Sequence, residues 1–272
     1  MNKKYFEANR KMWDEFAKAN FTAENEYYSV KSFLEGKTTL SQFMLDEIGD
    51  VKNKKLLHLQ CHFGLDTLSW VREGAIATGI DFSGEAIRLA KKLSHQAKIE
   101  ANFIQTNLYD LKDVLNEQFD IVFTSIGVLC WLPDLKKWAE IIAHFLKPNG
   151  FFYIADGHPF SHIFDNDNEK ELQVKYDYFE KSEPMEFIAE RTYALETSDM
   201  EPHAEYEWSH SLSEIMNSLI NARLKIEFLN EHPFSTMKHY KFSKKDKDGY
   251  YRLVNQKAEI PILFSLKASK II

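Results

Sequence analysis

The sequence lacks several features that would assign a protein to a class at once. It has only 2 cysteines among 272 residues, too few for the disulfide framework of a small secreted domain. No apolar run approaches the roughly 18 residues of a membrane-spanning helix. Residues 1–16 are charged throughout and lack the apolar core of a signal peptide. These absences predict a cytoplasmic protein with no membrane span.

Clustered basic charge is also scarce. Lys and Arg total 34 against 41 Asp and Glu, which gives a formal net charge of −7. The densest basic stretch, residues 244–247, includes an acid and precedes the turn pair Asp248-Gly249, which is typical of a solvated hairpin loop. Because phosphate contacts require clustered Lys and Arg, we expect no nucleic acid as substrate or partner.

From residue 56 onward the chain alternates short apolar runs with amphipathic segments. The strand-like runs are 56–60, 75–81, 101–106, 119–126, 151–156, 224–231 and 260–268. The helical patterns between them are 65–73, 84–93, 111–115, 133–146 and 211–222. This alternation predicts an α/β fold, in which a doubly wound, mostly parallel sheet of about seven strands is covered by helices on both faces.

Two segments depart from this alternation. Apolar residues recur at helical spacing from residue 5 to 46, which predicts an N-terminal helical cap over 1–50. After the fifth strand, residues 157–210 contain period-two stretches typical of antiparallel strands, at 173–180, 186–195 and 204–212.

The expected organisation is therefore a core of residues 51–156 and 211–272, interrupted by a β-rich insertion or lid at 157–210. Edge strands of the insertion could pair between two chains, so a homodimer stays open.

The stretch LLHLQCHFGLDTLSW, residues 56–70, has the pattern of a buried strand, a turn and a helix, and its turn contains one glycine, Gly64. Asp81 ends the next strand-like run, about twenty residues after Gln60, the spacing at which a carboxylate binds ribose hydroxyls in nucleotide-binding folds. A nicotinamide or flavin dinucleotide needs several glycines there, because backbone amides must approach its pyrophosphate. S-adenosylmethionine has no phosphate, so Gln60 and His62 are tolerable if they point away into the core.

Taken together, these stretches resemble the class I S-adenosylmethionine-dependent methyltransferases, of the small-molecule type that includes the quinone-biosynthesis methylases. LLHLQCHFG stands where that family shows D-x-G-x-G-x-G, and TGIDFS carries the ribose acid. QTNLYDL matches the adenine loop, FDIVFTSIGVLCWLPD the fourth strand with its loop, and LKPNGFFYIAD the fifth strand. The match covers residues 55–157 in detail and 211–268 in the order of elements.

The resemblance implies S-adenosylmethionine as cofactor, S-adenosylhomocysteine as product, and a set of cofactor contacts. The backbone of the turn would cradle the methionine part, through Gln60, Cys61, His62, Phe63 and Gly64. Asp81 would bind the ribose, Phe82 would pack on the adenine, and Asn107 with Leu108 would bind the adenine edge. Ser125 and Ile126 would line the floor near the sulfur.

The chain departs from the family pattern at several of these positions. His58 replaces the acid near the cofactor's ammonium, Gln60 and His62 replace two glycines, and Asn107 replaces the usual Asp. Asn107 can still accept a hydrogen bond through its side-chain oxygen. Asp66, at the start of the first helix, is the candidate to supply the missing carboxylate.

His158, in DGHPF after the fifth strand, is the candidate catalytic base, because ligands of open α/β folds bind at that edge of the sheet. The alternative is a turn histidine bonded to backbone. Zinc ligation by His58, Cys61 and His62 is not favoured, since no fourth ligand is evident and strand alternation separates the side chains. No metal is therefore expected.

The predicted function is transfer of a methyl group from S-adenosylmethionine to a small molecule. The reaction would be an in-line displacement at the sulfonium, with methyl donor and acceptor held in line. Two alternatives stay open. One is a nicotinamide-dependent oxidoreductase on the same layout, and the other is a non-catalytic regulatory protein with a degenerate cofactor site, which the departures at His58, Gln60 and His62 motivate.

Overall fold

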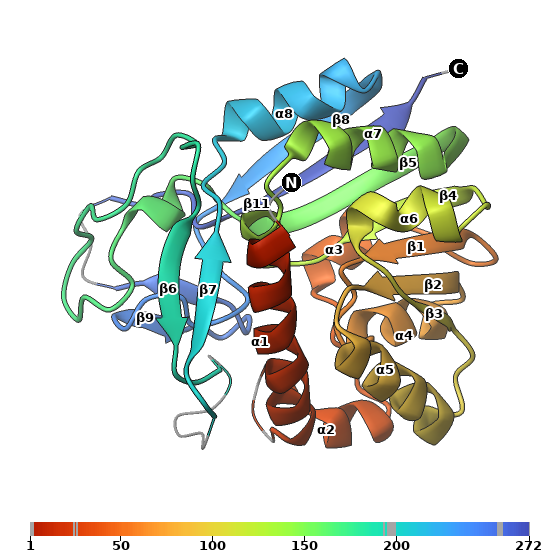
Figure 1. Cartoon of the computed structure of the whole chain (residues 1–272), viewed down its shortest axis with the longest axis horizontal. Coiled ribbons are helices and arrows are strands. Elements are labelled where there is room, and N and C mark those ends of the chain that lie inside the picture. Colours follow the sequence, from red (N-terminus) through yellow and green to blue (C-terminus); the bar gives the residue numbers. More distant parts are fainter. Residues whose placement is uncertain are drawn as a thin grey trace.

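A twisted seven-stranded sheet, ordered β3-β2-β1-β4-β5-β11-β8, forms the larger part of the molecule (Figure 1). The computed structural model describes residues 3–23, 25, 27–192, 194, 200–254 and 258–271. The strands of this sheet are β1 (Lys55–Leu59), β2 (Ile76–Asp81), β3 (Asn102–Gln105), β4 (Phe119–Thr124), β5 (Leu146–Gly157), β8 (Leu224–His232) and β11 (Leu263–Lys270).

Strands β1 to β5 pair in parallel, while β11 runs antiparallel to both β5 and β8. The helices of the sheet are α3 (Gln42–Ile48), α4 (Leu65–Arg72), α5 (Gly84–Ala97), α6 (Leu111–Val114), α7 (Leu135–Phe145) and α8 (Leu212–Asn221). The predicted doubly wound, mostly parallel seven-stranded sheet is confirmed.

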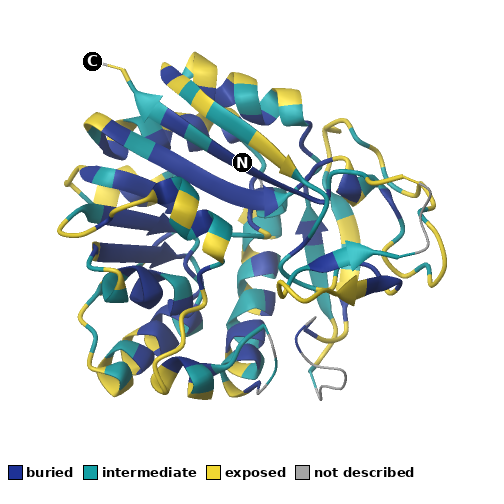
Figure 2. Cartoon of the chain, turned by 180° about the vertical axis from the view of Figure 1, so that it is seen from behind, coloured by how far each residue is buried: buried dark blue, intermediate teal, exposed yellow. Residues whose placement is uncertain are grey.

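The central strands of the sheet are buried on both faces and are dark in Figure 2, whereas the edge strand β8 is largely exposed or half-buried. Trp138 of α7 and Leu219 of α8 pack on one face with Leu57 and Leu59 of β1. The opposite face packs against α3 and α4, where Trp70 is fully buried. The alternation of β1 side chains between two apolar layers explains why this strand reads as a continuous apolar run.

The strand order reverses between β1 and β4, and ligands of open α/β sheets bind at the carboxyl ends of the strands at such a point. Helix α1 (Lys3–Thr22) crosses this edge and stands between the sheet and the ribbon of β6 (Met185–Ala189) and β7 (His203–Glu207) (Figure 1). Asn9 of α1 exchanges two hydrogen bonds with the backbone of Tyr206, at 2.8 and 2.9 Å. Helix α2 (Val30–Leu34) follows α1. Helix α1 thus covers the edge where a ligand is expected.

Residues 157–210 contain fewer strands than their sequence pattern predicts. The 186–195 and 204–212 stretches correspond to the antiparallel pair β6 and β7, and residues 193 and 195–199 lie outside the described part. The predicted strand at 173–180 is wrong, because only Val174 forms an isolated bridge, to Phe164. Among the residues that the structure describes, its apolar side chains have no adjacent strand to extend, and Val174 itself is 65% exposed.

The chain leaves the sheet in two long insertions, here called excursions: residues 157–210, and a second one between β8 and β11. Strands β9 (Ser243–Lys245) and β10 (Tyr251–Leu253) form an antiparallel hairpin around Asp248-Gly249, which confirms the hairpin predicted there. Tyr240 and Phe242 before this hairpin pack with Phe164 of the 157–210 segment and with Ile262. The two excursions therefore share one apolar cluster at the end of the sheet. Within the described residues, none of the helices has the length and apolar character required to span a bilayer.

Candidate cofactor and acceptor site

A cavity of about 950 Å³ lies at the carboxyl edge of the sheet. Its walls come from the turn after β1, the ends of β2, β4 and β5, helix α1, and both excursions. The cavity lining includes all the residues predicted to bind the cofactor: Gln60, Cys61, His62, Phe63, Gly64, Asp66, Asp81, Phe82, Asn107, Leu108, Ser125 and Ile126. The fold therefore brings these scattered positions to one place.

The turn after β1 keeps the backbone shape of a glycine-rich loop with little glycine. Gln60, His62 and Gly64 all have left-handed backbones, with φ of 54°, 51° and 79°. Each left-handed residue other than glycine costs about 1–3 kcal/mol. Gly64 meets a further constraint, because a Cβ there would lie 2.7 Å from the ring of Phe103. The third glycine position therefore requires glycine for steric reasons, whereas the first two tolerate side chains at the cost of strain.

The side chains of Gln60 and His62 do not point into the core, the condition under which the sequence made them tolerable in this turn. Cys61 and Phe63, which alternate with them, occupy the core and are 4% and 1% exposed. The side chains of Gln60 and His62 lie instead at the wall of the cavity. The His62 ring lies 5.4 Å from the ring centroid of Trp13, a residue of α1.

His58 occupies the position of the family acid as a buried neutral imidazole. Its Nδ1 lies 2.8 Å from Thr67 Oγ1 and its Nε2 lies 3.0 Å from Ser125 Oγ. Burial lowers the pKa of His58 to about 3. The ring therefore ties β1 to α4 and β4, and a neutral ring with both nitrogens engaged cannot neutralise an ammonium group.

Asp66 provides a carboxylate beside this histidine. Its Oδ1 accepts a hydrogen bond from Thr39 Oγ1 at 2.5 Å, and it is also hydrogen-bonded to Ser125. Burial raises the pKa of Asp66, and these two hydroxyl donors oppose that rise. A continuous chain of polar contacts thus runs through His58, Ser125, Asp66 and Thr39. Its carboxylate lies at position 66, whereas the family pattern has its acid at position 58.

Asp81 joins the turn after β1 to the end of β2. Its Oδ2 accepts from His62 N at 2.8 Å and its Oδ1 accepts from Ser83 N at 2.9 Å. The side chain is 7% exposed. Burial raises the pKa of Asp81 to about 6, and the nearby charge of Asp14 adds to the rise. A carboxylate with one acceptor site used on each oxygen can still accept from a ribose diol.

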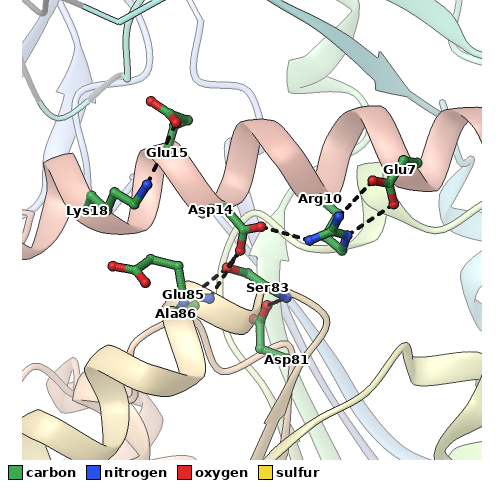
Figure 3. A network of polar contacts seen from close by, with 9 residues as sticks. All are labelled: Glu7, Arg10, Asp14, Glu15, Lys18, Asp81, Ser83, Glu85 and Ala86. Carbon is green, nitrogen blue, oxygen red and sulfur yellow. Dashed lines mark hydrogen bonds and ion pairs between the residues drawn. The ribbon is translucent and has the colours of Figure 1, made fainter.

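Asp14 of α1 contributes to the site, and no feature of the sequence predicted this residue. Its Oδ1 accepts from Ser83 Oγ at 2.6 Å and from Glu85 N at 3.1 Å, and Arg10 donates to its Oδ2 at 2.9 Å (Figure 3). Asp14 thereby satisfies an unpaired amide at the start of α5 and closes α1 against the cofactor edge. No local pattern could reveal a contact between residues 69 positions apart.

Phe82, Asn107 and Leu108, which the resemblance predicts to contact adenine, all line the cavity. Asn107 Oδ1 accepts from Tyr109 N at 3.0 Å and caps the short helix Leu108–Asp110. This bond occupies one lone pair of the Asn107 amide oxygen. The second lone pair stays available for the adenine contact that the resemblance predicts.

The loop after β4 is held by a buried carboxylate from the end of β5. Asp156, 2% exposed, accepts from the backbone N–H of Gly127 at 2.5 Å, Leu129 at 3.1 Å and Gly157 at 2.7 Å. The loop that begins at Ser125 is therefore fixed beside the turn after β1. Asp156 was not among the predicted site residues, although an acid ending a strand at this edge was a usable signal.

His158, the predicted catalytic residue, does not line the cavity. It is 3% exposed, its Nδ1 accepts from Phe160 N at 3.1 Å, and its Nε2 lies 2.8 Å from Glu231 Oε1. The turn at Pro159 directs this ring toward β8. His162, four residues later, lines the cavity instead, and its Nε2 would lie 2.3 Å from a Cβ at Gly157.

The cavity lining also carries paired carboxylates on β7. Glu205 and Glu207 lie two residues apart on β7, so they share one face of the strand. Burial raises the pKa of both, and their mutual contact raises that of Glu207 further. The pair adjoins Cys130, whose thiol pKa is raised by burial and by these charges.

Among the described residues, no group of three or more His, Cys, Asp or Glu side chains has a metal-binding arrangement. Burial also raises the pKa of the Cys61 thiol, which disfavours the thiolate that zinc requires.

Comparison with known proteins finds a family match over part of the chain. Residues 57–154 match the family described as a methyltransferase domain. The ubiquinone biosynthesis O-methyltransferase of Saccharophagus degradans is 29% identical over 122 residues, 44% of this chain and 51% of that protein. Its counterpart in Salmonella paratyphi A is 29% identical over 42% of this chain and 46% of its own length. The chain spans about half the length of these curated relatives.

Solved structures share the fold over most of the chain. An S-adenosylmethionine-dependent methyltransferase from Mesorhizobium loti superposes with a TM-score of 0.58 at 16% identity, covering 87% of this chain and 100% of that one. Another, from Clostridium acetobutylicum, has a TM-score of 0.56 at 14% identity and covers 96% and 97%. At these identities the likeness establishes the fold.

Proposed function

We propose that this chain, which carries a methyltransferase domain on a class I S-adenosylmethionine-dependent methyltransferase fold, transfers a methyl group to a small-molecule acceptor. S-adenosylmethionine, when bound, supplies an electrophilic methyl group on a sulfonium. The single observation that carries the proposal is the pairing of Asp81 with the backbone of His62 at the wall of the cavity. This bond joins the candidate ribose carboxylate to the loop that would cradle the methionine part.

The residues present fit such a cofactor. Asp81 retains acceptor capacity for a ribose diol, and Asp66 offers a carboxylate for the ammonium in place of His58. Phe82 provides an aromatic wall for the adenine, with Asn107 and Leu108 at its edge. Ser125 and Ile126 would form the floor beside the sulfur, fixed by Asp156 through the amides that follow them.

We assign the acceptor to the part of the cavity near β5 and β7. His162 is the candidate base there in place of His158, because it lines the cavity and His158 does not. The cavity lining carries more carboxylates than cations, namely Asp66, Asp81, Asp156, Asp167, Glu190, Glu205 and Glu207 against Arg191 and Lys238. This charge balance favours a neutral or cationic acceptor over an anionic one.

We also propose that residues 1–50 and 157–210 act as a cover for the core formed by 51–156 and 211–272. This division is supported by Asn9 and Asn20 of α1, which bond to Tyr206 and Thr192 on the far side of the cavity. Such a cover would exclude water from the reacting groups. The two cysteines of the chain are compatible with a cytoplasmic location. Its acidic balance supports a small-molecule acceptor over nucleic acid. A homodimer through β6 and β7 is the corresponding proposal for assembly.

Isothermal titration calorimetry with S-adenosylhomocysteine and NADH tests the function. Micromolar binding of S-adenosylhomocysteine, about −8 kcal/mol, with no heat from NADH is expected. Asp81→Ala should abolish most of that affinity, whereas Asp113→Ala, an exposed aspartate outside the cavity, should not. Binding of NADH alone would indicate an oxidoreductase, and no binding of either would indicate a protein without a cofactor.

A further inference from the structure

Two buried polar atoms in the cavity lining have no hydrogen-bond partner among the described residues. They are Gln60 Oε1 and His62 Nε2, both on the turn after β1. Buried polar groups in native proteins are nearly always paired, so each such atom requires an explanation. These two stand at the positions where the family pattern has its first two glycines.

The orientation of the Gln60 amide is fixed by a bond across the site. Its Nε2 donates to Val128 O at 3.2 Å, in the loop after β4. The reversed amide would place two oxygens against each other, so the geometry assigns the donor to the Val128 side. Oε1 is therefore a hydrogen-bond acceptor held between the turn after β1 and the loop after β4.

The His62 ring is held in place by aromatic neighbours and is neutral. Its centroid lies 5.4 Å from Trp13, 5.4 Å from Tyr28 and 4.4 Å from Phe63. Burial lowers its pKa to about 3. A neutral imidazole offers one donor and one acceptor, so Nε2 can bond to a ligand in either tautomer.

Both residues also have left-handed backbones, which glycine would adopt without strain. Strained residues at a ligand site are retained where their side chains contribute to the site. Because His58 is neutral and already bonded to Thr67 and Ser125, the site needs other groups for a zwitterionic ligand end. The two orphaned atoms supply them.

We infer that the side chains of Gln60 and His62 hold the amino-acid end of the cofactor, Gln60 Oε1 accepting from its ammonium and His62 Nε2, as the protonated nitrogen of the neutral ring, donating to its carboxylate. This inference rests on the proposed function. At positions 60 and 62 the side chains, and not the backbone alone, would contact the cofactor. Asp66 then adds the negative charge that an amide oxygen lacks.

Calorimetry with two ligands tests the inference. S-adenosylhomocysteine has the amino-acid end, and 5′-methylthioadenosine lacks it. Gln60→Gly and His62→Gly should each weaken S-adenosylhomocysteine by about tenfold, the value of one hydrogen bond to a charged group, and leave 5′-methylthioadenosine within about twofold. Thermal melting of both variants checks that they fold, because glycine relieves the backbone strain but removes the packing of the His62 ring and the bond of Gln60 to Val128.

Arg223→Gly is the matched control, since Arg223 also has a left-handed φ of 62° but is exposed and outside the cavity lining. It should leave the affinities for both ligands unchanged. Equal or tighter binding of S-adenosylhomocysteine by the two loop variants would overturn the inference, as would an equal loss for both ligands. If the wild-type protein bound neither ligand, the proposed function itself would fail.

Discussion

The backbone N–H of His62 donates a hydrogen bond to Oδ2 of Asp81 across 2.8 Å. This bond joins the turn after β1 to the end of β2, the two places from which a nucleoside is held in folds of this kind. His62 itself has a left-handed backbone, with φ of 51°. The shape of the turn and the position of the candidate ribose acid are therefore one structural unit.

The affinity for S-adenosylhomocysteine is expected to rise as the pH is raised from 5 to 7. Burial raises the pKa of Asp81 to about 6, so the free protein is largely protonated there at pH 5 and loses an acceptor for the ribose. The free energy of unfolding should change in the opposite direction. A carboxyl with a raised pKa stabilises the folded state at low pH, and that contribution is lost as the pH rises through about 6. Calorimetric titrations at four pH values, paired with urea unfolding at each, separate the two trends.

Asp14→Asn should move the midpoint of that affinity profile to lower pH. The charge of Asp14 is one of the causes that raise the Asp81 pKa, and asparagine keeps an oxygen for Ser83 Oγ and Glu85 N. Glu15→Gln, on the same helix, changes charge without those contacts and serves as the control. An unshifted midpoint in the Asp14 variant would show that Asp14 does not influence the carboxyl.

Gly64→Ala should destabilise the protein more than Gly249→Ala does. Both glycines have positive φ, 79° and 89°, but a Cβ at Gly64 would lie 2.7 Å from Phe103 whereas nothing lies within 4 Å at Gly249. The shared backbone strain is about 1–3 kcal/mol, and overpacking at Gly64 adds about 1–3 kcal/mol. Urea unfolding of the two variants measures the difference, and equal losses would contradict the steric account.

Asp156→Ala should lower both stability and cofactor affinity. Removing the carboxylate leaves the amides of Gly127, Leu129 and Gly157 without their buried acceptor, at about 1–3 kcal/mol for an unsatisfied group. The loop after Ser125 loses its fixed position, so S-adenosylhomocysteine should bind more weakly. Thermal melting with and without ligand checks both effects, and Asp113→Ala should change neither. A normal melting temperature would argue against the anchoring role.

His162 and His158 should differ in reactivity toward diethyl pyrocarbonate. His162 is exposed and lines the cavity, whereas His158 is 3% exposed and lies 2.8 Å from Glu231 Oε1. Peptide mass spectrometry should find His162 modified first. Faster modification of His158 would contradict its placement outside the cavity and restore it as the candidate base.

Much of the fold was predictable because it rests on short-range patterns. Apolar runs such as LLHLQ and FDIVFT predict buried parallel strands, and their alternation with amphipathic helices defines the doubly wound sheet that the structure contains. Asp81 was recognisable for the same reason, since its position follows from one strand–turn–helix–strand unit. The stretch 173–180 shows the limit of this reasoning, because period-two alternation needs an adjacent strand to become a sheet and none is paired with it in full.

The sequence by itself determined which residues end the parallel strands, and therefore which edge of the sheet carries polar groups. Tertiary structure alone decided which of those groups face the cavity. The turn at Pro159 sent His158 toward β8 and left His162 in the lining, and the packing of Cys61 and Phe63 into the core pushed Gln60 and His62 out of it. Asp14 reached α5 from 69 residues away. Such outcomes depend on contacts between distant segments, whose free energies no local pattern of residues encodes.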